Sequence, residues 1–193
     1  MRGAVLIGRV MGEEEGDKSR GSGITLYTVG HSNRSSEEFV GLLLKNGVEL
    51  LADIRKLPGS DKYPHFNRDE LAASLACAGI RYVYLEELGG RRRGGKDSVN
   101  TAWMNRSFRA YADHMETEEF RHGVEELLSY AKERRTAIMC SEAVWWRCHR
   151  ALVADYLKAI GVTVLHIMSS TSVKPHPYTS AARIVDGQLS YAG

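Results

Sequence analysis

Apolar runs alternate with amphipathic segments along most of the chain, and this alternation predicts its helices and strands. Five short runs rich in β-branched and aromatic residues predict strands at residues 24–31, 48–55, 81–88, 136–140 and 162–168. Between them, apolar positions at helical spacing predict helices at residues 35–47, 69–79, 107–135 and 149–161, the third of them broken near Thr117. Asp186-Gly187, close to the end of the chain, predicts a β-hairpin.

The order of these elements predicts the fold class. Strands that alternate with helices favour a parallel sheet covered on both faces. We therefore expect a three-layer α/β/α fold with a mainly parallel sheet of about five strands, followed by the C-terminal hairpin. A length of 193 residues is typical of one domain, which we place at residues 24–193. Residues 1–23 contain an acidic run and several glycines, which is typical of a mobile leader.

Composition excludes several classes of protein. The chain has no apolar run of roughly 18 residues and no secretory signal pattern, so we expect no membrane partner and a cytoplasmic location. Three cysteines, an odd number, argue against a disulfide framework. Of these, Cys77 lies in an apolar helical segment and is expected in the core. The net charge of +2 is too small to indicate nucleic-acid binding, which must be argued from local clusters.

Reactive and charged side chains gather where the predicted strands end. His31, Asp53, Arg55, Glu87 and Cys140 each lie at or just after the carboxyl end of a predicted strand. In open parallel sheets, ligands bind beyond this edge, near the N-termini of helices. The sequence therefore predicts a functional site at the carboxyl edge of the sheet.

Several of these residues suit acid–base chemistry, and each also has a structural interpretation. Glu142, in the loop after Cys140, is the strongest candidate for a catalytic carboxylate. His31 could act as a general base, or could orient its loop through a hydrogen bond. Asp53 and Arg55 could position a substrate, because arginine binds phosphate bidentately, or could form a buried structural ion pair.

The loop that follows the fourth predicted strand combines metal ligands of three kinds. Cys140, Glu142, Cys148 and His149 offer two thiolates, a carboxylate and an imidazole, which together suit zinc or iron. Their spacing matches no common metal motif such as Cys-x2-Cys. The alternative is structural, because a cysteine that ends a buried strand is commonly a small core residue. Cys148 and His149 could likewise pack against or cap the next helix.

The motifs of the chain resemble those of the DUF488 family. In chain order they are TVGHSNRSSEEFVGLL, LADIRKLPGSDKYPHFN, YVYLEELGG, FRAYADHM, MCSEAVWWRCHRALVADYL and VLHI. The paired glycines of that family correspond to Gly89 and Gly90, and its Cys-x-Glu and Cys-His-Arg elements lie within residues 140–150. This chain has Val144-Trp145-Trp146 where a proline often stands in the family. The resemblance implies an α/β domain and no particular activity.

The layout is also similar to that of rhodanese-like domains, which place Asp-x-Arg after an early strand and a cysteine loop before a helix. That similarity implies sulfur transfer, or phosphatase chemistry, through a thiolate at Cys140. Backbone N–H groups of such a loop bind an anion and lower the pKa of the thiol. Glu142 opposes this ionisation, and Arg147 follows Cys140 by seven positions rather than the six of cysteine phosphatases.

A basic loop and neighbouring tryptophans favour an anionic ligand that carries a base. Residues 89–95 read GGRRRGG, after Glu87, which could be an acid–base group or an acceptor in a tight turn. Arginines bind phosphates and tryptophans stack on nucleobases. The expected substrate-binding residues are Arg55, Glu87, Gly89, Gly90, Trp145, Trp146, Arg147 and Arg150. The alternative is a solvated basic loop beside buried tryptophans.

Together these features predict an enzyme that acts on a phosphate-containing ligand with a nucleobase, either a nucleotide or a nucleic acid. Hydrolysis or base removal by Glu142, with His31 or Asp53, is the expected chemistry. Two alternatives are open, namely rhodanese-like sulfur transfer through Cys140 and a nucleic-acid-binding module without catalysis.

Overall fold

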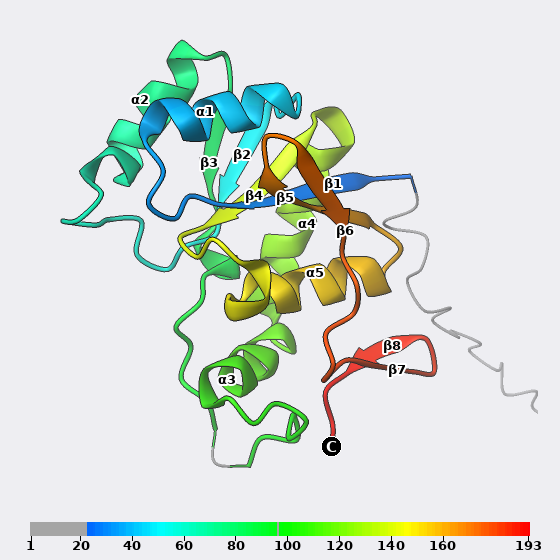
Figure 1. Cartoon of the computed structure of the whole chain (residues 1–193). Helices are drawn as coiled ribbons and strands as arrows, with labels where there is room; N and C mark the ends of the chain where they lie inside the picture. The colour runs from blue at the N-terminus through cyan, green and yellow to red at the C-terminus, as the bar shows by residue number, and fades with distance from the viewer. Residues whose placement is uncertain (1–22, 96) are drawn as a thin grey trace, which may run out of the picture.

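The computed structural model describes residues 23–95 and 97–193. Apart from Gly23, the predicted leader at residues 1–23 lies outside the described residues. A six-stranded sheet with the order β3-β2-β4-β1-β5-β6 forms the centre of the fold (Figure 1). Its strands are β1 (Thr25–Gly30), β2 (Leu50–Asp53), β3 (Arg81–Tyr84), β4 (Thr136–Cys140), β5 (Thr163–Ser169) and β6 (Ser172–Pro175). The first five are parallel and β6 is antiparallel to β5, so the predicted mainly parallel sheet is confirmed.

Helices cover both faces of this sheet and complete the three layers (Figure 1). They are α1 (Ser36–Lys45), α2 (Arg68–Cys77), α3 (Arg106–Met115), α4 (Glu118–Glu133) and α5 (Arg150–Ala159). Phe39 of α1 and Leu71 of α2 belong to one buried cluster, with Val29 of the sheet. Phe120 of α4 and Leu152 of α5 belong to the other. Two separate cores of this kind are what a sheet covered on both faces requires.

Local sequence signals explain where the helices begin and end. Ser35 caps α1, and the Glu38 carboxylate accepts a hydrogen bond from the backbone N–H of Ser35, which completes a capping box. Thr117 caps α4 and separates it from α3, at the predicted break. The predicted C-terminal hairpin forms from β7 (Arg183–Val185) and β8 (Gln188–Ser190). Its turn residues Asp186 and Gly187 both have positive φ, 49° and 81°, as a type I′ turn requires.

Two details differ from the sequence-based expectations. The strand β6 was not expected, because Ser172–Pro175 is mostly exposed and has no buried apolar alternation. Cys77 is exposed, so its predicted place in the core is wrong. The residues of α2 that face the core are Leu71 and Leu75, and Cys77 falls outside that stripe. In the described part of the chain, every helix is too short or too polar to cross a membrane.

The strand order brings three strand ends together at the middle of the sheet. The chain passes from β1 to β2 and β3 and then returns to place β4 between β2 and β1. Gly30 at the end of β1 is in register with Cys140 at the end of β4. Asp53 at the end of β2 is in register with Met139. The residues that follow these strands therefore start from one short stretch of the carboxyl edge.

Candidate functional site

A pocket of about 760 Å³ lies at this carboxyl edge. Of the predicted site residues, it is lined by His31, Arg55, Gly90, Glu142, Arg147 and the three residues Cys140, Cys148 and His149. They come from the ends of β1, β2 and β4, the loop after β3 and the start of α5. The pocket thus stands where parallel sheets of this type bind ligands.

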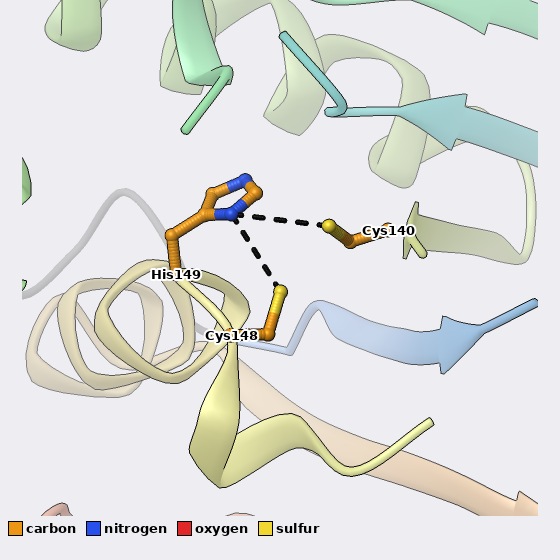
Figure 2. A group of neighbouring side chains, drawn as sticks. All are labelled: Cys140, Cys148 and His149. Carbon is orange, nitrogen blue, oxygen red and sulfur yellow. Dashed lines mark hydrogen bonds between the residues drawn. The ribbon is translucent and has the colours of Figure 1, made fainter. Parts of the chain in front are cut away.

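The two buried cysteines and one histidine form a compact cluster at the inner end of the pocket. The Nδ1 atom of His149 lies 3.6 Å from Sγ of Cys148 and 3.9 Å from Sγ of Cys140. Figure 2 shows both sulfur atoms directed at this ring nitrogen, one from the end of β4 and one from the turn before α5. The opposite ring nitrogen of His149, Nε2, bonds to the carbonyl oxygen of Ile54 at 2.9 Å. A carbonyl only accepts, so Nε2 carries a proton, and Nδ1 is the ring nitrogen that faces the two sulfurs.

The two thiols have different acidities. A hydrogen bond with Cys148, together with burial, raises the pKa of Cys140 to about 12. Burial also acts to raise the pKa of Cys148, but hydrogen bonding from Cys140 and the charge and N–H of Arg150 lower it to about 7. The backbone N–H of Arg150 lies 3.5 Å from Sγ of Cys148. Cys148 is therefore the thiol that ionises near neutral pH, while Cys140 keeps its proton.

Asp53 and Arg55 form a buried ion pair beneath the pocket. Nη2 of Arg55 lies 2.6 Å from Oδ2 of Asp53, and the same carboxylate accepts from Nε and the backbone N–H of Arg55. Tyr82 donates a further hydrogen bond to Asp53 at 2.8 Å. Asp53 has no exposed surface, whereas Arg55 lines the pocket. Asp53 therefore fixes the guanidinium of Arg55 and has no direct access to a ligand.

His31 connects this ion pair to the loop after β1. Its Nδ1 bonds to the Ser32 carbonyl at 2.9 Å, and its Nε2 lies 3.4 Å from Nη1 of Arg55. Its ring stacks on Phe66 at a centroid distance of 4.1 Å. Burial and the neighbouring Arg55 charge lower the pKa of His31 to about 4, so the ring is neutral at pH 7. In this state His31 accepts a hydrogen bond from Arg55.

The loop between Cys140 and His149 is held in place by a buried arginine. Arg150 donates from Nη2 to the Glu142 carbonyl at 2.5 Å and from Nη1 to the Thr28 hydroxyl at 3.3 Å. Gly30 lies directly against the same carbonyl, and a side chain at position 30 would overlap it. The side chain of Glu142 is left at the exposed rim of the pocket.

The three consecutive arginines at positions 91–93 have separate places. Arg91 lines the pocket, with a positive φ of 56°. Arg92 donates to the carbonyls of Gly89, Glu86 and Glu87. It also pairs with the Glu119 carboxylate of α4 at 2.8 Å, so its role is to hold the loop against that helix. Arg93 is exposed and does not line the pocket. Only one arginine of the run therefore faces the pocket.

A family model described as "Domain of unknown function DUF488" matches residues 35–157. The chain belongs to the DUF488 family. No curated protein and no solved structure matches the chain. The DUF488 match includes Arg55, Cys140, Glu142, Cys148 and His149, so most of the pocket lies within the family domain. It begins after His31 and ends before β5 and the C-terminal hairpin.

Six predicted site residues of the DUF488 domain do not line the pocket. They are Asp53, Glu87, Gly89, Trp145, Trp146 and Arg150. Trp145 instead stacks flat on His166, with centroids 4.5 Å apart, and Trp146 is exposed at the surface. Glu142 is likewise outside the cluster of Cys140, Cys148 and His149, whose three ligand atoms lie within 4.8 Å of one another.

Sequence reasoning also missed several residues that do line the pocket. They are Lys62, Tyr63, Phe108 and Tyr111. Lys62 and Tyr63 belong to the long loop after β2, which was expected at this edge, so their position was available as a signal. Phe108 and Tyr111 come from α3, and nothing in the local sequence pattern links the start of that helix to the carboxyl edge. The Tyr111 ring packs on His149 at 5.0 Å between centroids.

Proposed function

We propose that this DUF488 protein is an enzyme that hydrolyses a phosphate-containing ligand with a nucleobase, bound in the carboxyl-edge pocket. The observation that carries the proposal is the charge of the pocket wall. Lys62, Arg91 and Arg147 line the pocket and form no ion pair with any described residue. Cations without a carboxylate partner around a concave site attract phosphate strongly. Glu142 is the single carboxylate in the described lining.

The proposed ligand places its phosphate and its base on different parts of the wall. Arg147 and Arg91 bind the phosphate oxygens, and Arg55, held in one orientation by Asp53, adds a third guanidinium. Tyr63 and Phe108 supply aromatic surface for the base, in place of the tryptophans expected from the sequence. A base bound in this way is removed from any stack, as enzymes that act on bases require.

Glu142 is the proposed general base. Its carboxylate stands at the rim among the cations, where it can take a proton from an attacking water molecule. His31 is a poor base at neutral pH because its pKa is lowered to about 4. We therefore assign to His31 a positioning role on Arg55, and reserve the proton transfer for Glu142.

Sulfur transfer through Cys140 receives less support. Such chemistry needs a thiolate at neutral pH, and the pKa of Cys140 is raised to about 12. A nucleic-acid-binding role through the arginine run also receives less support, because Arg92 is already bonded to three carbonyls and a carboxylate. The pocket itself is the feature that favours a bound small group or a single unstacked nucleotide.

The experiment is a hydrolysis assay on purified full-length protein. Nucleoside mono-, di- and triphosphates and an alkylated single-stranded oligonucleotide are incubated with the enzyme, and free base and phosphate are measured by chromatography. Glu142→Gln is expected to lower kcat about 100-fold or more, as loss of a general base does. Arg147→Ala is expected to raise KM, because the lost contact binds the ground state as well.

The matched control is Arg93→Ala, which removes a neighbouring cation that does not line the pocket. This variant should keep the activity of the wild type. Absence of turnover with every substrate, or a Glu142→Gln variant as active as the wild type, would contradict the proposed function. Binding of the oligonucleotide with steep salt dependence but without turnover would favour the non-catalytic alternative.

A further inference from the structure

We infer that Cys140, Cys148 and His149 form a zinc site whose fourth coordination position opens into the carboxyl-edge pocket. Their three ligand atoms lie within 4.8 Å of one another, and the residues come from two separate elements. Two cysteines and one imidazole suit zinc better than the oxygen-preferring cations, and the thiol of Cys140 releases its proton to solvent when the ion binds. This inference stands on the cluster alone and does not rest on the proposed hydrolysis.

The interatomic distances match those of a tetrahedral zinc site. A Zn–S bond of about 2.3 Å and a Zn–N bond of about 2.0 Å, at the tetrahedral angle, place sulfur and nitrogen about 3.5 Å apart. The observed separations from Nδ1 of His149 are 3.6 Å to Cys148 and 3.9 Å to Cys140. Both sulfurs lie on the same side of His149 near Nδ1 (Figure 2), so one ion placed between the three atoms could bind all of them. Metal binding requires only small movements of these side chains.

The surroundings of His149 also fit a metal ligand. Metal-binding histidines usually donate their other ring N–H to a carboxylate or a backbone carbonyl, which fixes the tautomer. Nε2 of His149 bonds to the Ile54 carbonyl in this way at 2.9 Å, which leaves Nδ1 as the nitrogen that can bind a metal ion. Gly90 packs against this ring, because an added Cβ there would lie 2.8 Å from Nδ1.

The three ligands leave one position for a water molecule or a ligand group. Among the described residues, no fourth histidine, cysteine, aspartate or glutamate joins this cluster. All three ligand residues line the pocket, which places the remaining position on the pocket side. Three protein ligands and one open position are typical of catalytic rather than structural zinc. Glu142 lines the same pocket without belonging to the cluster.

The test is metal binding to the full-length protein, measured without any substrate. The reduced, chelator-treated protein is titrated with Co²⁺, and the visible and near-ultraviolet spectrum reports tetrahedral geometry and thiolate-to-cobalt charge transfer. Zn²⁺ is then added to displace the Co²⁺, and elemental analysis gives the stoichiometry. We expect one ion per chain with charge-transfer bands, and complete displacement by Zn²⁺.

Cys77→Ser is the matched control, because it removes an exposed thiol away from the cluster. It should bind the metal as the wild type does. Cys140→Ser and Cys148→Ser should each weaken binding by more than the roughly 10- to 100-fold cost of losing an outer-shell partner. Circular dichroism reports whether these variants fold, and the wild-type spectrum tests the thiolate ligands independently of them.

Three outcomes would overturn the zinc site. The first is a reduced wild-type protein that binds neither Co²⁺ nor Zn²⁺, and the second is an unchanged cobalt spectrum in both cysteine variants. The third is a reversible Cys140–Cys148 disulfide in a protein whose reduced form binds no metal, which would make the pair a redox couple. Failure of the nucleotide assay with metal bound would contradict the proposed hydrolysis alone. Turnover by a metal-free wild-type protein that binds no ion would contradict the zinc site alone.

Discussion

At the scale of single residues, the site depends on charges that are buried with their partners. Asp53 has no exposed surface and accepts hydrogen bonds from Arg55 and Tyr82. Arg55 is 5% exposed and reaches from this carboxylate to His31 and the pocket. Asp53 therefore acts through the orientation that it gives to the guanidinium of Arg55.

We expect Asp53→Asn to destabilise the protein by about 3–5 kcal/mol, because it leaves the buried guanidinium of Arg55 without a compensating charge. Urea unfolding at neutral pH measures the change. The control is Glu86→Gln, which breaks the partly exposed pair between Lys56 and Glu86 and should cost less than about 1 kcal/mol. Similar losses for the two variants would show that burial of the Asp53 pair has no special energetic weight.

At the scale of elements, the sequence predicted most helices and strands because two local signals agreed. Apolar periodicity marked α1, and the Ser35–Glu38 capping box marked its start. The exposed edge strand β6 has no such periodicity, and its pairing with β5 depends on a contact that local sequence does not encode. The same contrast between local signals and long-range contacts applies to the residues of the site. The sequence predicted which residues follow the ends of the parallel strands, whereas it did not predict the direction of Trp145, which begins a single turn of 3-10 helix after β4.

The contact between β1 and the cysteine loop allows a prediction at this scale. Gly30→Ala places a methyl group on the Glu142 carbonyl, which must move together with the loop that holds the cysteine–histidine cluster. We therefore expect lower stability and weaker cobalt binding. Gly41→Ala is the control, because it lies within α1 with open space around an added Cβ.

This control should stabilise the protein by about 0.5–1 kcal/mol, since alanine favours a helix over glycine. Urea unfolding and the cobalt titration are measured on both variants. A Gly30→Ala protein with wild-type cobalt affinity would mean that the loop after β4 adjusts without disturbing its ligands.

At the scale of the whole molecule, one buried hydrogen-bond chain ties the site to the C-terminal segment. Nη1 of Arg150 donates to Thr28, which bonds to Nδ1 of His166 at 2.7 Å. Nε2 of His166 bonds to Nδ1 of His176 at 2.8 Å, and Nε2 of His176 to Asp155 at 2.9 Å. Each group in this chain can donate in the same direction, from Arg150 to Asp155, while both histidines are neutral.

Asp155, at the far end of this hydrogen-bond chain, contacts residues that the family match does not include. Asp155 also accepts hydrogen bonds from Thr179 and from Tyr191, beyond the C-terminal limit of the match at residue 157. No local pattern predicts this connection, because residues 28 and 191, which both belong to it, lie 163 positions apart. Only the packing of α5, β1 and β5 brings them together.

This arrangement predicts that the protein loses stability as the pH falls below 6.5. Burial, with the neighbouring His176 and Arg150, lowers the pKa of His166 to about 3, and burial with Arg55 lowers that of His31 to about 4. The unfolded histidines bind protons near their ordinary pKa of 6.5. Between pH 6.5 and about 4 the unfolded state therefore binds more protons, so acid favours unfolding.

We expect each of these two histidines to contribute about 1–2 kcal/mol to the loss of unfolding free energy between pH 7.5 and pH 5. Urea unfolding at both pH values, for the wild type and for His166→Gln and His31→Gln, measures these contributions. Each variant is less stable at pH 7.5 but should lose less on acidification than the wild type, because it has no imidazole to protonate at that position. An equal loss in the wild type and in both variants would show that other groups control the acid response. A smaller loss in His166→Gln would instead connect acid unfolding to the buried chain behind the pocket, because a proton on Nδ1 of His166 displaces the hydrogen bond from Thr28.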